Sequence, residues 1–138
     1  MDPLNSKIEY RNPKQIQMTK IQNKKKYDLE DRTLCFARKA IDYISKLPSS
    51  VANIEIGKQL VRAAGSVGAN YIEANESLGK KDFVMRIKIS RKEAKECRYW
   101  VKLSNPEKTF VTEKDFLIIE STELMNIFGS ILRKFQSG

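Results

Sequence analysis

Apolar residues recur every three or four positions in four separate segments of this 138-residue chain. That spacing places them along one face of an α-helix. Pro48, Gly79 and the pair Asn105-Pro106 divide the segments, and such residues interrupt or end helices. No segment alternates apolar and polar residues as a half-buried strand does. The pattern therefore predicts an all-α chain, and its length fits one domain.

The first predicted helix runs from about Asp28, its N-cap, to Leu47. The second starts after a cap at Ser49 or Ser50 and is ended by Gly79, the third covers residues 81–103, and the fourth opens at Thr112. The residues expected to face inward are Leu34, Ala37, Ile41, Ile44 and Leu47; Ile56, Leu60, Ala63, Val67, Tyr71, Ala74 and Leu78; Phe83, Ile87, Ala94, Cys97 and Val101; Leu117, Leu124, Phe128, Ile131 and Phe135.

Four helices of about 20 residues joined by short links are expected to form an up-down-up-down antiparallel four-helix bundle over residues 28–138. Residues 1–27 differ in composition, with two prolines, few apolar residues and seven basic against two acidic side chains. They are expected to be a disordered basic N-terminal extension. Its cluster Lys24, Lys25 and Lys26 could clamp a nucleic acid or simply add solubility.

Several classes of protein are disfavoured by composition. The chain has no histidine, which excludes His-based nucleophile pairs and metal sites. Cys35 and Cys97 are far apart and form no CxxC pair, so they are expected to be reduced core residues of a cytoplasmic protein. No apolar run is long enough for a membrane span or a secretory signal.

The stretch AAGSVGANYIEA, residues 63–74, places two glycines inside a predicted helix. Each costs about 1 kcal/mol relative to Ala in a helix interior, so packing must compensate. The small side chains are expected to allow close approach of another helix. The polar residues Asn70, Tyr71 and Glu73 are expected to fix the crossing through a buried polar network.

Basic residues dominate the third predicted helix. Residues 80–102 contain nine Lys or Arg side chains and three acidic ones, within a chain of net charge +9. A basic stripe can follow the phosphates of a nucleic acid, and Tyr99 could stack on a base. The alternative is a solvated outer face, although such faces usually mix both signs. The candidate nucleic-acid-binding residues are Lys81, Lys88, Arg91, Lys92, Lys95, Arg98, Tyr99, Lys102, Lys24, Lys25 and Lys26.

The carboxylates of Glu93 and Glu96 share one side of this helix. They are expected to form structural ion pairs with Arg62 or Arg32 rather than to act as acid and base. Trp100 is expected in the core or at a subunit interface. Because no nucleophile–base pair, phosphate loop or metal cluster is present, we expect no enzymatic activity, no catalytic residue, no metal and no cofactor.

Segments of two helices resemble a known family. They are Gln59-Leu60 with Arg62, Gly65 to Tyr71 with Glu73-Ala74, Asp82-Phe83, Lys92-Glu93-Ala94 with Glu96, and Tyr99-Trp100, joined upstream by Asp31-Arg32-Thr33 and Phe36-Ala37. Over residues 28–135 the chain resembles the four-helix-bundle proteins encoded in bacterial 23S rRNA intervening sequences. That family includes the accessory variability protein of diversity-generating retroelements.

The resemblance implies a homopentamer with a basic surface that binds nucleic acid, and in one branch an association with a reverse transcriptase. The first hypothesis is thus a non-enzymatic bundle that binds RNA or DNA as a homo-oligomer. The alternative is an accessory or scaffold subunit whose partner is a protein such as a reverse transcriptase. A partner retained after nuclease treatment would favour the alternative.

Overall fold

Four long helices and one short 3-10 turn make up the part of the chain that the structure describes. The structure is a computed structural model, and it describes the backbone of residues 13–136 and the side chains of residues 29–136. The elements are α2 (Pro13–Ser45), α3 (Val51–Asn75), α4 (Lys80–Leu103), η1 (Lys108–Phe110) and α5 (Val111–Gln136). Within the described residues no strand is present. The predicted all-α class is confirmed.

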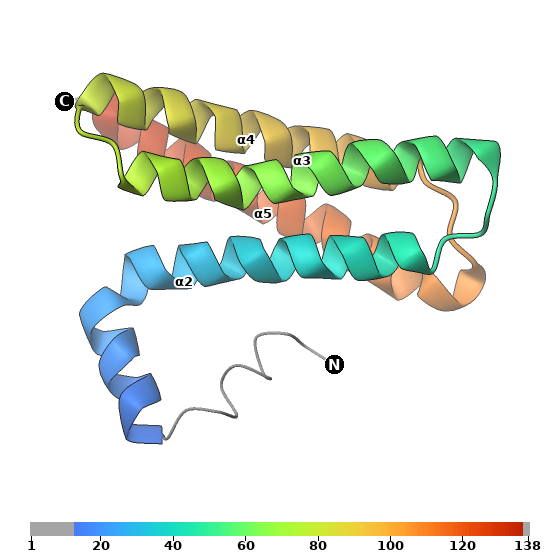
Figure 1. Cartoon of the computed structure of the whole chain (residues 1–138), viewed down its shortest axis with the longest axis horizontal. Coiled ribbons are helices and arrows are strands. Elements are labelled where there is room, and N and C mark those ends of the chain that lie inside the picture. The colour runs from blue at the N-terminus through green and yellow to red at the C-terminus, as the bar shows by residue number, and fades with distance from the viewer. Residues whose placement is uncertain (1–12, 137–138) are drawn as a thin grey trace.

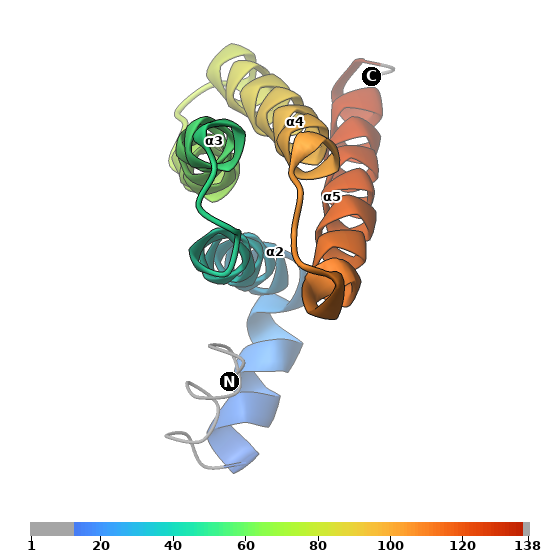
Figure 2. The same cartoon turned by 90° about the vertical axis from the view of Figure 1, so that its right-hand side faces the viewer.

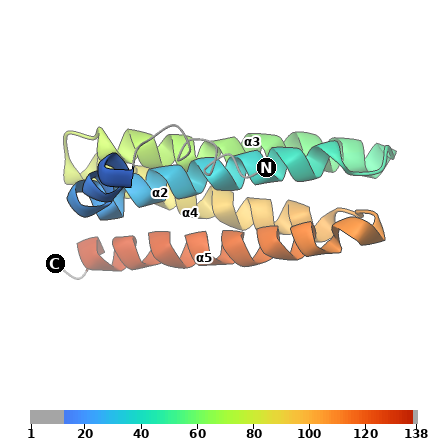
Figure 3. The ribbon, with the colours of Figure 1, turned by 90° about the horizontal axis from the view of Figure 1, so that it is seen from below.

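Successive helices run in opposite directions, as the colour gradient of Figure 1 shows. Viewed along the bundle, α3 and α4 lie next to each other, and α5 lies beside α4 (Figure 2). The view from below shows α2 beneath α3, with α5 along the opposite edge (Figure 3). The arrangement is the up-down-up-down bundle that the short links predict.

The first helix starts earlier than predicted, at Pro13 instead of Asp28. After Pro13, which suits the first helical position, this segment holds no further Pro or Gly up to Ser45. The prediction missed this part of the helix because the segment has few apolar residues, although most of its residues have good helix propensity. Residues 13–27 are therefore helical, and α2 bends before it enters the bundle (Figure 1). Residues 1–12, the rest of the predicted extension, lie outside the described residues.

The inward face of α2 also differs from the prediction. Leu34 and Ile41 are 38% and 51% exposed. The face in the core is the neighbouring one, and it consists of Leu29, Thr33, Phe36, Ala40 and Tyr43. Two apolar stripes lie side by side on this helix, and the one with the large aromatic side chains is buried. Of the predicted stripe, Ala37, Ile44 and Leu47 are half-buried and pack against the core, so the prediction is correct for these three residues.

The other three helices bury most of the predicted residues. The four α4 residues Ile87, Ala94, Cys97 and Val101 are buried, as are Leu117, Leu124 and Phe128 of α5 and the predicted α3 positions from Ile56 to Ala74. Phe135 is 36% exposed, yet its ring packs on that of Phe83 with centroids 4.8 Å apart. Leu78 is fully exposed, because α3 already ends at Asn75.

At the helix ends, one predicted N-cap is confirmed and two predicted helix boundaries are wrong. Ser50 caps α3, and its Oγ accepts a hydrogen bond from the backbone N–H of Asn53 at 3.0 Å. Gly79 does not end α3; it precedes α4 in an extended conformation with φ of −137°. Thr112 lies inside α5, because the 3-10 turn η1 leads directly into Val111.

The small residues of α3 have different roles. A Cβ on Gly68 would lie 2.8 Å from Oγ1 of Thr33, so α2 approaches too closely for any side chain there. A Cβ on Gly65 would meet nothing within 4 Å. The close crossing predicted for this stretch therefore rests on Gly68, together with the buried Ala63 and Ala64.

The polar part of the same stretch is confirmed only in part. Asn70 donates to Oγ of Ser66 at 2.9 Å and accepts from Arg86 at 3.0 Å, which links α3 to α4. Glu73 is exposed, so it does not belong to a buried network. It lies on the solvent side of α3.

Asn53 joins the two loops at one end of the bundle. Its amide donates to the carbonyl oxygens of Pro48 and Asn105, both at 3.0 Å. Its Oδ1 accepts from the backbone N–H of Asn105 at 3.1 Å. Nearby, the buried hydroxyls of Tyr43 and Ser104 are hydrogen-bonded at 2.6 Å.

Candidate nucleic-acid interface

The positive charge of the bundle is concentrated on α4. This helix carries nine basic and three acidic side chains. By contrast, α3 has two of each, and α5 has three basic against four acidic. Helix α4 therefore provides the surface most able to attract an anion.

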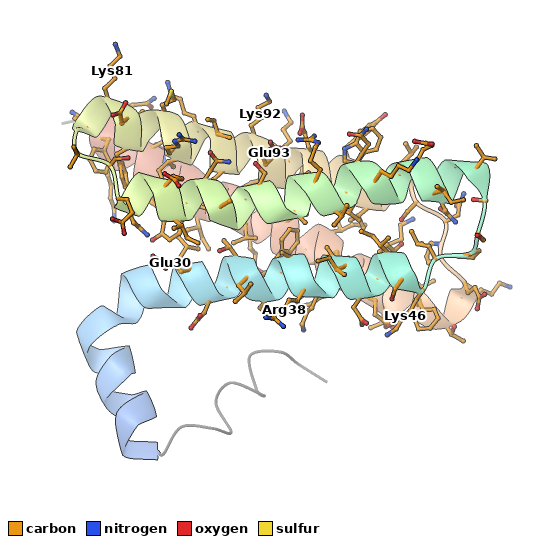
Figure 4. All side chains as sticks on the ribbon, viewed as in Figure 1. Glu30, Arg38, Lys46, Lys81, Lys92 and Glu93 are labelled. Carbon is orange, nitrogen blue, oxygen red and sulfur yellow. The ribbon has the colours of Figure 1, made fainter. Side chains whose placement is uncertain are left out.

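Most of the predicted α4 residues reach the solvent. Lys81, Lys88, Arg91, Lys92, Lys95, Tyr99 and Lys102 are all exposed. Lys81 and Lys92 project from the outer side of α4, whereas Arg38 and Lys46 lie on α2 at the opposite edge (Figure 4). The core positions Ile87 and Ala94 point the other way, so the amphipathic pattern of this helix fixes the direction of its basic face.

The basic side chains of α4 form no ion pair with residues 29–136. Within residues 29–136, none of the nine basic side chains of α4 lies within salt-bridge distance of an Asp or Glu. Elsewhere Lys46 pairs with Asp42, and Lys58 pairs with Glu55. A solvated helix face normally carries both signs, and the described part of the α4 face does not.

A groove follows this basic face between α4 and α5. Its volume is about 490 Å³. The lining side chains are Lys88, Arg91, Lys92 and Lys95 from α4, with Met125, Gly129, Leu132, Arg133 and Gln136 from α5. Five of the nine lining residues are cationic and none is acidic. We call it the α4–α5 groove.

Two arginines of the α4–α5 groove lie near Gly129. A Cβ built on Gly129 would lie 3.5 Å from Nη1 of Arg133 and 3.7 Å from Nε of Arg91. Side chains from two helices, α4 and α5, thus lie near Gly129. Arg133 also donates to Oγ of Ser130 at 3.0 Å.

Arg98 and Tyr99 occupy different positions around α4. Arg98 is half-buried and donates to Oγ1 of Thr122 on α5 at 3.2 Å, so it holds the two helices together. Tyr99 is 59% exposed and packs edge-on against Trp100, with centroids 5.1 Å apart. The half-buried Trp100 packs against the core. Of these two rings, that of Tyr99 is therefore the more exposed.

The side of α4 that faces α3 carries an acidic pair. Arg62 lies 3.6 Å from Oε2 of Glu93 and 3.6 Å from Oε2 of Glu96, which confirms one of the two predicted partners. The other candidate, Arg32, binds Glu120 and Glu123 of α5 instead. Burial is the main cause of a raised pKa of Glu93, and the carboxylate of Glu96 raises it further. This cluster is separate from the basic face.

Other expectations meet the structure only in part. The side chains of Lys24, Lys25 and Lys26 lie outside the described residues. Cys97 is buried and Cys35 half-buried. No group of three or more His, Cys, Asp or Glu side chains among residues 29–136 could hold a metal ion. None of the described helices is long and apolar enough to cross a bilayer.

The sequence predicted the basic residues of α4 but not the residues of α5 that line the groove beside them. Gly129, Arg133 and Gln136 were not predicted as site residues, because each is unremarkable within its own segment. A helical register that pairs α4 with an antiparallel α5 would have aligned Arg91 with Gly129. That register depends on the packing of the bundle.

Comparisons with known proteins place the chain in context. The model of the 23S rRNA-intervening sequence protein family matches residues 17–129. The chain is also similar to a protein of unknown function from the S23 ribosomal protein family of Bacteroides thetaiotaomicron, whose crystal structure is known. The TM-score is 0.62 at 27% identity, and the match covers 75% of this chain and 96% of that one. No curated protein matches.

Proposed function

Since the chain belongs to the 23S rRNA-intervening sequence protein family, we propose that it is a non-enzymatic protein that binds RNA or DNA through the basic face of α4. One observation carries the proposal: the nine basic side chains of α4 have no acidic partner among residues 29–136. Several cations on one helix can bind a single anion together when that anion carries closely spaced negative charges. The phosphates of a nucleic acid backbone are spaced in this way.

Binding of this kind is mainly electrostatic and weakly dependent on base sequence. Lys side chains act as point charges on phosphates, which carry no sequence information. The α4 face offers no Asn or Gln for base edges between residues 80 and 103. Affinity should therefore fall steeply with salt, with a log–log slope of roughly −0.7 per phosphate contact for a single strand.

The direct test reverses three charges. In the variant Lys88→Glu, Lys92→Glu, Lys95→Glu, we expect loss of detectable binding to RNA and DNA at low salt, measured by fluorescence anisotropy. A matched control reverses three exposed cations outside α4, namely Arg38→Glu, Lys58→Glu and Lys108→Glu. Both variants change the net charge equally, so only the position of the charge differs.

The control should bind more tightly than the α4 variant by at least about tenfold. Circular dichroism must give equal helicity for both. If the two variants bind equally, net charge alone governs binding and the α4 face has no special role. If the α4 variant binds as tightly as the parent protein, the proposal is wrong.

Tyr99 provides a second contact for a single strand. An exposed ring within a basic face can stack on a base, which contributes about 1–3 kcal/mol per base. Trp100 holds the ring from one edge. Tyr99→Ala should weaken binding to single strands about tenfold, whereas Tyr99→Phe should keep it, because stacking needs only the aromatic face. Equal affinity of both variants and the parent would remove this contact from the proposal.

We also propose that the protein acts as a homo-oligomer, which for the pentamer rests on the family resemblance. Support comes from a groove of about 410 Å³ between α2 and α3. Among its lining residues Ile41, Ile54 and Val61 are 51%, 50% and 42% exposed. A second copy would cover these apolar side chains, and contiguous exposed apolar surface often marks an interface.

Light scattering tests the oligomer. The parent should give a mass above the 15.9 kDa of one chain, and Ile41→Glu with Ile54→Glu should lower it towards that value. The same measurement on Arg38→Glu, an exposed residue of α2 that does not line the groove, controls for added negative charge. A parent that stays monomeric at high concentration would contradict the oligomer without affecting the proposal for α4.

A further inference from the structure

The two walls of the α4–α5 groove differ in chemistry. The α4 wall includes three lysines at steps of four and three residues, namely Lys88, Lys92 and Lys95. The α5 wall has three uncharged positions at the same steps, namely Met125, Gly129 and Leu132, with Arg133 and Gln136 towards the C-terminal end of the helix. Such steps bring residues onto one helix face. Each row is therefore about 10 Å long, at a rise of about 1.5 Å per residue.

Gly129 leaves the middle of the α5 wall without a side chain. A Cβ at this buried position would contact only arginine side-chain atoms, at 3.5 Å or more, so the packing of the helices does not require glycine. Glycine is also disfavoured inside a helix. Its effect here is to keep the wall open between the half-buried Met125 and Leu132.

A ligand that matches both walls carries closely spaced negative charges and a flat or apolar group beside them. A nucleic acid strand has both, because each phosphate is followed by a base. In a duplex the faces of the bases are stacked inside the helix, so a protein reaches them only when the nucleotide is unpaired. The chemistry of the groove therefore favours a single strand over a duplex.

We propose that the α4–α5 groove binds an unpaired nucleotide of a single strand, with phosphates along the lysines of α4 and the base against Met125 and Gly129 of α5. This inference rests on the proposed nucleic-acid binding and specifies the form of nucleic acid that the groove accepts. Contact with the face of a base tolerates any sequence, because every base has such a face. The contact is separate from that of Tyr99, which does not line the groove.

The first measurement compares two strands that differ only in their bases. Fluorescence anisotropy gives the affinity for a short single-stranded RNA and for a strand of equal length whose central nucleotides lack bases. Both strands carry the same number of phosphates, so the difference reports the bases alone. The measurement uses the variant Tyr99→Ala, which removes the other proposed base contact. We expect this protein to prefer the strand with bases by about tenfold.

Filling the groove should abolish that preference. In the Tyr99→Ala background, Gly129→Leu places a side chain between Met125 and Leu132 and changes no charge. The preference for bases should be lost, while the slope of affinity against salt stays the same. The matched control is Gly65→Leu on α3, an exposed glycine where a Cβ would meet nothing within 4 Å. It should keep the preference at equal helicity by circular dichroism.

A second measurement needs no substitution, in case Gly129→Leu does not fold. A single-stranded RNA that carries one 4-thiouridine is crosslinked to the unmodified protein by light, and the attached peptide is identified by mass spectrometry. We expect crosslinks to the peptide of α5 that contains Met125. The same nucleotide paired within a duplex should lose them. Crosslinks confined to α4, or equal crosslinking of the paired nucleotide, would overturn the proposal.

The remaining outcomes separate this inference from the proposed function. If Gly129→Leu keeps the preference for bases as Gly65→Leu does, the bases bind elsewhere and the role of the groove is refuted. If both strands bind equally well to the Tyr99→Ala protein, the groove contacts no base, although binding of phosphates to α4 stands. If neither strand binds to the unmodified protein, both the inference and the proposed function are wrong.

Discussion

Substituting Ala for Gly68 and for Gly65 should change stability in opposite directions. Both glycines lie within α3, so both substitutions gain the same helix propensity of up to about 1 kcal/mol. The surroundings differ. A Cβ on Gly68 would lie 2.8 Å from Oγ1 and 3.1 Å from Cβ of the buried Thr33, whereas one on Gly65 would meet nothing within 4 Å.

The difference in the free energy of unfolding between the two variants follows from these contacts. Oxygen and carbon atoms at 2.8 Å must move apart by several tenths of an ångström, and overpacking of this kind costs about 1–3 kcal/mol. The propensity gain is common to both variants and cancels in the comparison. Gly65→Ala should therefore exceed Gly68→Ala by about 2 kcal/mol in the free energy of unfolding, with the parent between them.

Urea unfolding followed by circular dichroism, at one protein concentration, measures the comparison. Thr33→Ala removes the Oγ1 atom of the 2.8 Å contact. In the Gly68→Ala background it should therefore recover part of the loss, with a favourable coupling energy in a double-mutant cycle. If Gly68→Ala is as stable as Gly65→Ala, the close approach of α2 to α3 does not require glycine at position 68, and the account of this crossing is refuted.

Three further predictions concern the polar contacts. Asn53→Ala removes hydrogen bonds to Pro48 and Asn105 and should lower stability by about 2 kcal/mol, with faster amide exchange in both loops; unchanged exchange would contradict the link. Arg32→Ala breaks the two 2.7 Å hydrogen bonds to Glu120 and should cost about 1–2 kcal/mol in urea unfolding, since Glu120 is left largely buried without its partner; a neutral result would show that water replaces Arg32. Burial raises the pKa of Glu93 above its ordinary value near 4.5, so the folded protein holds this proton more tightly than the unfolded chain does. Stability should thus fall as pH rises from below 4.5 through the raised pKa, and Glu93→Gln should flatten that part of the pH profile. Parallel profiles of the two proteins would mean that Glu93 titrates normally.

Local sequence patterns were sufficient for the helices and for most of the core. The apolar spacing of α3, α4 and α5 corresponds to most of their buried residues, because the inward-facing side chains recur at every third or fourth position. Helix α2 has two adjacent apolar stripes, and the spacing alone could not say which one the bundle covers. The structure buries Phe36 and Tyr43 and leaves Leu34 and Ile41 exposed, because packing favours the stripe with the larger side chains.

The candidate nucleic-acid interface was also predicted only in part from the sequence. The basic character of α4 is visible in its sequence, and so is the direction of its lysines, because the 3.6-residue period fixes both. The choice of Arg62 over Arg32 as the partner of Glu93 was left open, since it depends on which helices are neighbours. Gly79 and Thr112 were misassigned, because loop geometry decides how a helix begins or ends.

The sequence by itself determined an all-α bundle of antiparallel helices with a basic third helix and no histidine chemistry. These features follow from the spacing of apolar residues, from the Pro and Gly residues between the helices, and from the composition. Only the tertiary structure decided which residues meet across helices. It placed Gly68 against Thr33, Arg62 against Glu93, and Arg91 near Gly129. The physical reason is that a helix fixes its own residues to about 100° steps, while the register between two helices is set by how their side chains pack.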